Sequence, residues 1–401
     1  MKLSIYCSML AALVVGHLAE ASSKPLQVYI LAGQSNMQGH AKVSTFEHIG
    51  MDVNSKPMLD DMQNSKGDPK VCDRVWISTI GCADTEQVGK LTAGFGAAKR
   101  GPKIGPEFTF GITMEKQTDA PILIIKTAWG GKSLHTDFRP PSAGPYEFNE
   151  AELAKLRAQS KDFDAEKLEK EKATGVYYRQ MIAHVNAVLA DIKRVVPEYD
   201  SKQGYELSGF VWFQGWNDLV DGNAYPRRGK AGGYSAYSDA MAHLIRDVRK
   251  DLKTPKLPFV IGVMGVGGPT QEYGPDQKRY RFSHQSFRDA MAAPAKLPEF
   301  KDNVTVVLTE KFWDPELTAT KAKANALRKE AKQIAEKKKL NATESKALYE
   351  KINNQGLSAR EQKILEKGIS NAEYHYLGSA KILGAIGQEF ARVLSGVSNN
   401  H

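Results

Sequence analysis

The stretch YILAGQSNM, residues 29–37, begins as an apolar strand, stops at Gly33 and has a serine two positions later. Open α/β sheets bind their ligands outside the carboxyl ends of the strands, so this pattern places Ser35 where such proteins keep their active sites. A serine after a strand and a glycine also commonly caps the helix that follows. From this stretch alone, Ser35 is either a nucleophile or a turn residue.

Four further apolar runs follow the first one, and helical patterns separate them. Each run is nearly continuous in apolar residues, as expected for strands buried on both faces of a parallel sheet. The alternation of strands and helices favours an α/β fold with helices on both faces of the sheet. The expected strands are Leu26–Leu31, Ile122–Thr127, Leu207–Phe213, Pro258–Met264 and Val304–Leu308, with a hairpin around Val75–Ile80 and helices over about 106–117, 176–196, 235–253, 280–293 and 378–394.

Two stretches look inserted into this framework. Residues 150–174 and 317–367 are dense in Lys, Glu and Ala, which indicates solvated helices that pack or shield rather than bind a partner. The longer stretch has breaks near 341–344 and 356–358. Thr343 or Ser358 would cap a helix there, and Ser358 has the fuller capping box.

The N-terminus has the pattern of a secretory signal peptide over residues 1–21. Lys2 precedes an apolar run from Leu3 to Leu18, and Ala19-Glu20-Ala21 supplies the small residues of a cleavage site. The run is too short for a membrane span, and a buried strand or helix is the alternative. We therefore expect an exported mature protein, secreted or periplasmic, that forms one domain over residues 22–401 without stable membrane insertion.

Charge and cysteine usage limit the partners. The formal net charge is +9, from 55 basic and 46 acidic residues, and much of the excess lies in the Lys-rich helical stretches. No basic run interleaved with aromatic residues and no zinc-finger spacing occurs, so nucleic-acid binding is not expected. In an exported protein Cys72 and Cys82 could form a disulfide, and two free buried thiols are the equal alternative. Neither has the spacing of a metal site.

Two later segments place polar groups after expected strands. Residues 126–133 end like a phosphate loop, but Lys126 stands where that motif needs a glycine, so nucleotide binding is excluded. The paired glycines suit either a backbone N–H aimed at a bound oxygen or an ordinary tight turn. Residues 214–218 follow the third strand, where a side-chain amide could stabilise an oxyanion. The alternative for Asn217 is a helix or turn cap.

A histidine just before the last expected helix completes the set. His375 lies in a loop, which suits a general base, because a free serine hydroxyl is a weak nucleophile without a nearby imidazole. His40 and His135 compete with it, since both lie near expected strand ends. His184 and His243 fall within expected helices and suit packing or surface roles.

In this order, the four segments resemble the conserved blocks of the SGNH (GDSL-like) hydrolase superfamily. Residues 33–37 (GQSNM) and 212–215 (WFQG) are similar to its sialate O-acetylesterase-like and acetylxylan esterase branch, and the blocks span residues 26–394. The resemblance implies a flavodoxin-like three-layer α/β/α sandwich with a five-stranded parallel sheet. It further implies an exported serine acetylesterase that acts on an acetylated carbohydrate through an acetyl-serine, without a metal or organic cofactor.

The resemblance also implies roles for single residues. Ser35 would be the nucleophile and His375 the base, with the backbone N–H groups of Ser35 and Gly131 forming an oxyanion hole. Asn217 fits the Gly-x-Asn-Asp pattern of the superfamily. The esterase branch usually has an acidic residue near that position, so Gln214 would share the donor role.

The carboxylate behind His375 departs from the superfamily pattern. An Asp usually stands three residues before the His, where this chain has Ala372. Glu373, two residues before, is the preferred candidate, and Asp314 after the fifth strand is the alternative. A dyad without a carboxylate is the third reading, since the orienting carboxylate raises the rate but is not itself the base.

Two other classes of function stay open. One is a carbohydrate-binding protein that has lost turnover on the same fold, which the uncertain carboxylate keeps open. The other is an esterase, lipase or thioesterase for non-carbohydrate substrates, although no long apolar lid is evident. Aromatic side chains near the motifs could stack on a sugar ring or belong to the core: Trp129, Trp216 and Tyr374.

Overall fold

The computed structural model describes residues 24–159 and 162–398, and the expected signal peptide lies outside them. Within this range a seven-stranded sheet has the order β4-β3-β6-β1-β7-β8-β9. Its strands are β1 (Leu26–Gly33), β3 (Val75–Ile80), β4 (Gln87–Lys90), β6 (Ile122–Ala128), β7 (Tyr205–Phe213), β8 (Phe259–Val263) and β9 (Val304–Leu308). The α/β class predicted from the sequence is confirmed.

The expectation of five strands is wrong in number. The five predicted strands form the parallel order β6-β1-β7-β8-β9, which is the flavodoxin order 2-1-3-4-5. The hairpin of β3 and β4 extends this sheet beyond β6, with β3 parallel to β6 and β4 antiparallel to β3. Because β3 is almost wholly buried, its backbone groups need partners, and the free edge of β6 supplies them.

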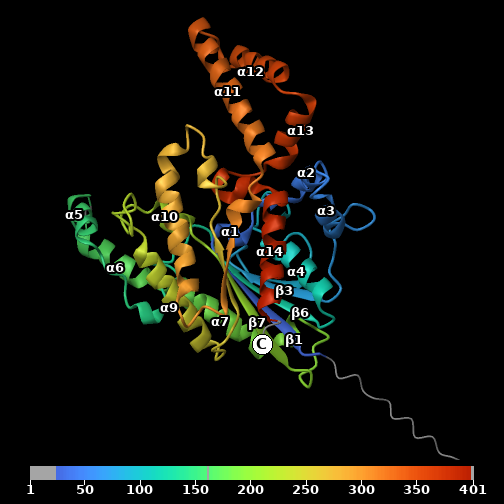
Figure 1. Ribbon diagram of the computed structural model, residues 1–401, viewed down its shortest axis with the longest axis vertical. Coiled ribbons are helices and arrows are strands. Elements are labelled where there is room, and N and C mark those ends of the chain that lie inside the picture. Colours follow the sequence, from blue (N-terminus) through green and yellow to red (C-terminus); the bar gives the residue numbers. More distant parts are fainter. Residues whose placement is uncertain (1–23, 160–161, 399–401) are drawn as a thin grey trace, which may run out of the picture.

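Helices cover both faces of the sheet and complete three layers (Figure 1). On one face α4 (Pro106–Gln117) packs against α14 (Ala380–Ser398). The other face carries α7 (Val176–Ala190), α9 (Ser235–Asp251) and α10 (Arg281–Ala292). These five helices lie where the sequence predicts them, because apolar side chains recur along each helix on the face that it buries.

The remaining short elements lie in the connections between these helices and strands. The short helices are α1 (Ser35–Gln38), α2 (Phe46–Ile49), α3 (Lys56–Met62) and α8 (Trp216–Val220), and β2 (Ala41–Lys42) pairs antiparallel with β5 (Lys103–Ile104). The 3₁₀ turns are Val43–Thr45, Pro141–Ala143, Ile192–Arg194, Thr270–Glu272, Lys278–Tyr280, Ala293–Lys296, Thr309–Phe312 and η8 (Glu373–Gly378).

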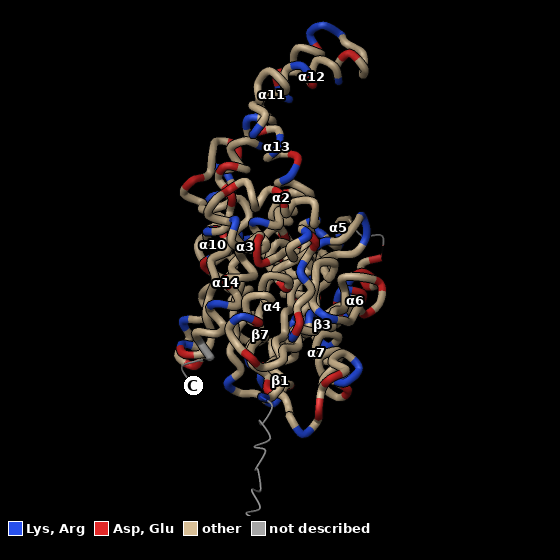
Figure 2. Tube along the Cα trace, turned by 90° about the vertical axis from the view of Figure 1, so that its right-hand side faces the viewer, with Lys and Arg blue, Asp and Glu red and all other residues tan. Residues whose placement is uncertain are grey.

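Both stretches that look inserted are helical. α5 (Glu150–Gln159) and α6 (Phe163–Ala173) lie at the side of the sheet, and α11 (Pro315–Lys338), α12 (Ala342–Gly356) and α13 (Ala359–Gly368) form an arm that extends away from it (Figure 1). Basic and acidic residues alternate along this helical arm (Figure 2), as on a solvated helix face.

The caps within the helical arm confirm one expectation and correct another. Ser358 caps α13 in a capping box with Glu361, as predicted. α12 is capped by Asn341 rather than Thr343, because the Asn341 side chain accepts from the backbone N–H of Glu344 while the Glu344 carboxylate accepts from the backbone N–H of Asn341.

The two cysteines in the described part of the chain are free. Cys72 and Cys82 are both buried thiols, so the disulfide is not formed in this structure. Burial raises the pKa of the Cys72 thiol to about 12. Among the helices of residues 24–159 and 162–398, none combines the length and the apolar composition that crossing a membrane requires.

Candidate active site

The carboxyl ends of β1, β6 and β7 meet where the strand order reverses. Gly33, the last residue of β1, lies opposite Ala128 of β6 and Phe213 of β7. A Cβ atom on Gly33 would lie 2.1 Å from the Phe213 carbonyl oxygen, so only glycine lets these strand ends pack. The next residues of the chain therefore enter the switch point of the sheet, where open α/β folds bind ligands.

Ser35 is the first residue of α1 and is 8% exposed. Gln34 caps this helix, because its side-chain oxygen accepts from the backbone N–H of Asn36 at 2.9 Å. The Ser35 hydroxyl donates a short hydrogen bond to the same Gln34 oxygen. The capping role that the sequence allows for Ser35 thus falls to its neighbour.

A buried ion pair between Lys126 and Glu107 supports α1. The ammonium group of Lys126, on β6, donates to the Gln38 carbonyl at 2.8 Å, the Phe95 carbonyl at 2.9 Å and the Glu107 carboxylate at 2.7 Å. Both charged side chains are fully buried. The other Glu107 oxygen accepts from the backbone N–H of Gly105. The sequence signal for this pair is a lysine within an otherwise apolar strand, which residue spacing alone does not interpret.

The loop after β6 passes beside Ser35. A Cβ atom on Gly130 would lie 3.9 Å from the Ser35 Cβ and 3.0 Å from the Gln38 side-chain oxygen. Gly131 has φ of +76°, a left-handed conformation that favours glycine, and nothing lies within 4 Å of its Cβ position. Gly130 therefore makes the close backbone approach, and Gly131 makes the turn into open space.

The loop after β7 carries the two predicted amide donors, and only one of them is free. Both N–H groups of the Gln214 amide are engaged, one to the Lys132 carbonyl at 3.0 Å and one to the Asp218 carboxylate at 2.6 Å. The expectation that Gln214 shares the oxyanion role is therefore not supported. Asn217 is half-buried, and its side chain makes no hydrogen bond within the described part of the chain, so its amide is free to donate.

Asp218, which belongs to the Gly-x-Asn-Asp pattern but has no role assigned from the sequence, joins these loops. Its fully buried carboxylate is surrounded by donors from both sides of the site. They are the backbone N–H groups of Leu134 and His135, the Gln214 amide and the Tyr225 hydroxyl, at 2.6–3.0 Å. A buried carboxylate needs such donors, and meeting that need draws the loops after β6 and β7 together.

His375 lies on η8, which packs against α1. Its ring stacks on His40, with centroids 3.9 Å apart and an angle of 3° between the planes. Burial lowers the pKa of His375 to about 4, so the ring is neutral at pH 7. Among the described residues no hydrogen bond joins His375 to Ser35, whose hydroxyl is turned toward Gln34.

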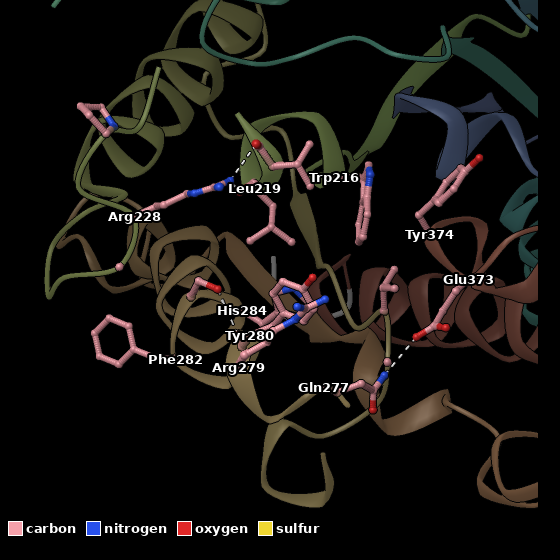
Figure 3. Close-up of a pocket in the computed structure, with 16 residues that line it drawn as sticks. Trp216, Leu219, Arg228, Gln277, Arg279, Tyr280, Phe282, His284, Glu373 and Tyr374 are labelled. Atoms are coloured by element: carbon pink, nitrogen blue, oxygen red, sulfur yellow. Dashed lines mark hydrogen bonds between the residues drawn. The ribbon is translucent and has the colours of Figure 1, made fainter. Parts of the chain in front are cut away.

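Neither predicted carboxylate contacts His375. Glu373 pairs with Lys321 at 3.0 Å and accepts from the Gln277 amide at 3.0 Å (Figure 3). Asp314 pairs with Lys381 at 2.8 Å and caps α11. Each carboxylate lies beside its own cation, which stabilises it there. The Nδ1 atom of His375 instead lies 3.0 Å from the side-chain oxygen of Asn371, a residue absent from the sequence prediction.

The remaining histidines that the sequence analysis names have partners elsewhere. His135 lies 3.1 Å from the Asp221 carboxylate. His184 contacts the Ser78 hydroxyl at 2.9 Å, and His243 contacts the Ser142 hydroxyl at 2.7 Å. Of the two imidazoles that compete with His375 in the sequence, the structure thus brings His40 to His375 and leaves His135 with Asp221.

A pocket of about 920 Å³ opens beside α8 and the turn η8 (Figure 3). The loops after β7 and β8 and the turn η8 line it. Trp216 and Tyr374 lie near each other on one side with ring centroids 5.7 Å apart, and Arg228 lies toward the other end. Neither Ser35 nor His375 lines this pocket, but Tyr374 directly precedes His375. Trp129 is not part of the lining and packs on Phe138 and Tyr177.

The family model described as "Carbohydrate esterase, sialic acid-specific acetylesterase" matches residues 25–310. The chain belongs to this family. The match includes Ser35, the glycine loop after β6 and Asn217, and it ends before His375. The membership makes this protein a carbohydrate esterase by family, within the SGNH-like superfamily.

A comparison with solved structures finds two proteins to which this chain is similar at low sequence identity. One is a protein from Arabidopsis thaliana, 18% identical, covering 71% of this chain and 86% of that one, with a TM-score of 0.37. The other is a carbohydrate acetylesterase from Xanthomonas citri, 14% identical, covering 72% of this chain and 51% of that one, with a TM-score of 0.37. A comparison with curated proteins finds no match.

Proposed function

We propose that this protein is an exported serine esterase that removes O-acetyl groups from a carbohydrate. The observation that carries the proposal is the packing of α1 against η8, which holds the segments of Ser35 and His375 together at the switch point of the sheet. Serine hydrolysis needs a hydroxyl and an imidazole that can come within hydrogen-bond reach. Membership in a carbohydrate esterase family supports the same chemistry.

In the proposed mechanism the Ser35 hydroxyl rotates from Gln34 toward His375, a change of one side-chain rotamer. His375 takes the proton as the oxygen attacks the acetyl carbonyl. The backbone N–H of Ser35, a backbone N–H of the glycine loop after β6 (Gly130 or Gly131) and the free amide of Asn217 stabilise the oxyanion. The sugar hydroxyl leaves with the proton from His375, and water then releases acetate from the acetyl-serine.

The pocket lining supports a sugar with an acidic group as the substrate. Tyr374 is 42% exposed, and such an aromatic ring suits the apolar face of a sugar ring. Arg279 also lines the pocket, and among the described residues it has no carboxylate partner. A guanidinium that lies over an aromatic ring and has no carboxylate partner favours a carboxylate-bearing sugar over a neutral one.

The direct test is acetate release from a substrate panel. O-acetylated sialic acid, acetylated xylan, a neutral sugar acetate and an aryl acetate would be compared at equal acetyl concentration. We expect turnover of the aryl acetate and of at least one acetylated sugar, with the acidic sugar preferred. Absence of acetate release from all four would refute the esterase proposal, and turnover of the aryl ester alone would refute the carbohydrate substrate.

Replacing Arg279 by glutamine is expected to raise KM for the acidic sugar about tenfold, which corresponds to about 1.4 kcal/mol. KM for the neutral sugar acetate should not change, because that substrate has no carboxylate for the Arg279 guanidinium to bind. Steady-state kinetics on both substrates measures the difference. Equal changes in KM for the two substrates would show that Arg279 does not recognise the acidic group.

The pH profile should report His375. Its pKa is lowered to about 4 by burial, so the base is neutral above that pH and becomes protonated below it. We expect kcat/KM for an aryl acetate to stay level from about pH 8 down to about pH 5 and to fall at lower pH. An acid limb centred near pH 6.5, the usual value for histidine, would contradict this assignment.

A further inference from the structure

The turn η8 and the residues just before it bring the side chain of Asn371 to the Nδ1 edge of the His375 ring. The backbone N–H of Asn371 donates to the Leu377 carbonyl at 3.0 Å, and that of His375 donates to the Ala372 carbonyl at 3.0 Å. Tyr376 and Leu377 have φ of 53° and 60°, a left-handed conformation that is uncommon for residues other than glycine. This closed turn makes the residue four positions before the histidine, rather than three, its neighbour in space.

The hydrogen bonds of the Asn371 side chain identify its two ends. The backbone N–H of Ala372 donates to the side-chain oxygen of Asn371 at 2.7 Å, so this atom is the acceptor end of the amide. The same oxygen lies 3.0 Å from the Nδ1 atom of His375. An oxygen that can only accept requires a proton on Nδ1. The Nε2 atom of His375 then keeps its lone pair, which is the state a general base needs.

The nitrogen end of the same amide extends the arrangement to His40. It lies 3.4 Å from the Nδ1 atom of His40, which acts as the acceptor. Burial, together with the charges of His375, Lys103 and Lys126, lowers the pKa of His40 to about 3, so the stacked ring is neutral. Asn371 thus contacts both imidazoles, and the stack restricts the tilt of the His375 ring.

We propose, on the basis of the esterase function above, that Asn371 is the positioning residue of the catalytic imidazole, in the place where related enzymes use a carboxylate. It fixes the tautomer of His375 without adding a negative charge. The charged groups on the elements packed around His375 already have partners. The ion pairs are Glu373 with Lys321, Lys381 with Asp314 and Asp52, and Lys126 with Glu107. Lys103, which lies on the His40 side, donates to backbone carbonyls. Lys42, on β2, adds a further positive charge on that side.

The test compares Asn371→Ala and Asn371→Asp by NMR of histidine labelled with ¹³C and ¹⁵N, with the His375 signals assigned from their loss in His375→Gln. The wild type should show the Nδ1–H tautomer of His375, and Asn371→Ala should lose it. In Asn371→Asp a carboxylate next to the ring favours imidazolium, so the His375 pKa should rise by about one unit or more. Asn341→Asp adds the same charge at the tip of the helical arm, where Asp also caps a helix, and should leave that pKa unchanged.

Kinetics on an aryl acetate adds a second reading. Asn371→Ala should lower kcat/KM about 10- to 100-fold, because the imidazole loses its orientation, and Asn371→Asp should move the acid limb of the profile to higher pH. An Nε2–H tautomer in the wild type, or an unchanged His375 pKa in Asn371→Asp, would overturn the positioning role. The NMR readouts need no turnover. An inactive wild type with the Nδ1–H tautomer would therefore refute the esterase proposal while the positioning role stands.

Discussion

Replacing Ser35 by alanine is expected to lower kcat/KM for aryl acetate hydrolysis by about 10⁴-fold or more, with an unchanged melting temperature. The loss is large because the Ser35 hydroxyl oxygen is the atom that attacks the acetyl carbonyl, and alanine lacks it. The fold should persist, because Gln34 rather than Ser35 caps α1 and the Gln34 oxygen keeps its bond from the backbone of Asn36. Steady-state kinetics and thermal unfolding measure the two effects.

The matched control for this change is Ser345→Ala in α12 of the helical arm, which should keep full activity. Mass spectrometry gives an independent reading, since an organophosphonate that labels serine esterases should modify the peptide that contains Ser35 in the wild type and not in Ser35→Ala. Near-wild-type turnover by Ser35→Ala, or a label on another serine in the wild type, would show that the nucleophile lies elsewhere.

Replacing Lys126 by methionine is expected to lower the free energy of unfolding by about 3–5 kcal/mol. The substitution leaves the Glu107 carboxylate buried without its cation and removes the donor from the carbonyls of Gln38 and Phe95. Because the Gln38 carbonyl belongs to α1, the segment of Ser35 also loses its support. Guanidinium unfolding of the variant, followed by circular dichroism, measures the effect.

Two further variants test that the effect comes from the uncompensated charge. The double variant Lys126→Met with Glu107→Met should recover at least half of the lost stability, because apolar side chains of similar volume replace a buried ion pair at little cost. Lys56→Met removes an exposed pair with Asp60 and should change stability by no more than about 0.5 kcal/mol. A single Lys126 variant as stable as the Lys56 variant would contradict the importance of the buried pair.

The sequence predicted the parallel strands well because their signal is local. A strand buried on both faces has to be apolar at nearly every position, as residues 122–125 are, and the glycine that ends β1 marks where the chain turns. The strand Val75–Ile80 was also recognised as extended. Its pairing with β6 was not predicted, because nothing in its six residues specifies which free sheet edge it will join.

Site residues whose roles depend on partners were harder to predict. Gln214 was a reasonable oxyanion donor by residue type, but both of its N–H groups serve Asp218 and a backbone carbonyl. Glu373 was a reasonable acid by spacing, but Lys321 holds its carboxylate away from His375. In each case a group that the fold brings within reach takes the hydrogen bonds: Asp218 and the Lys132 carbonyl for Gln214, and Lys321 for Glu373.

The sequence by itself determined the α/β class, the five parallel strands and the positions of Ser35 and His375 next to strand and helix ends. These features follow from apolar continuity and glycine stops, which act over a few neighbouring residues. Only the tertiary structure decided the two extra strands, the buried Lys126–Glu107 pair and the choice of Asn371 as the neighbour of His375. Side-chain hydrogen bonds and ion pairs select among all groups that the fold brings within about 3 Å, and spacing along the chain does not reveal that set.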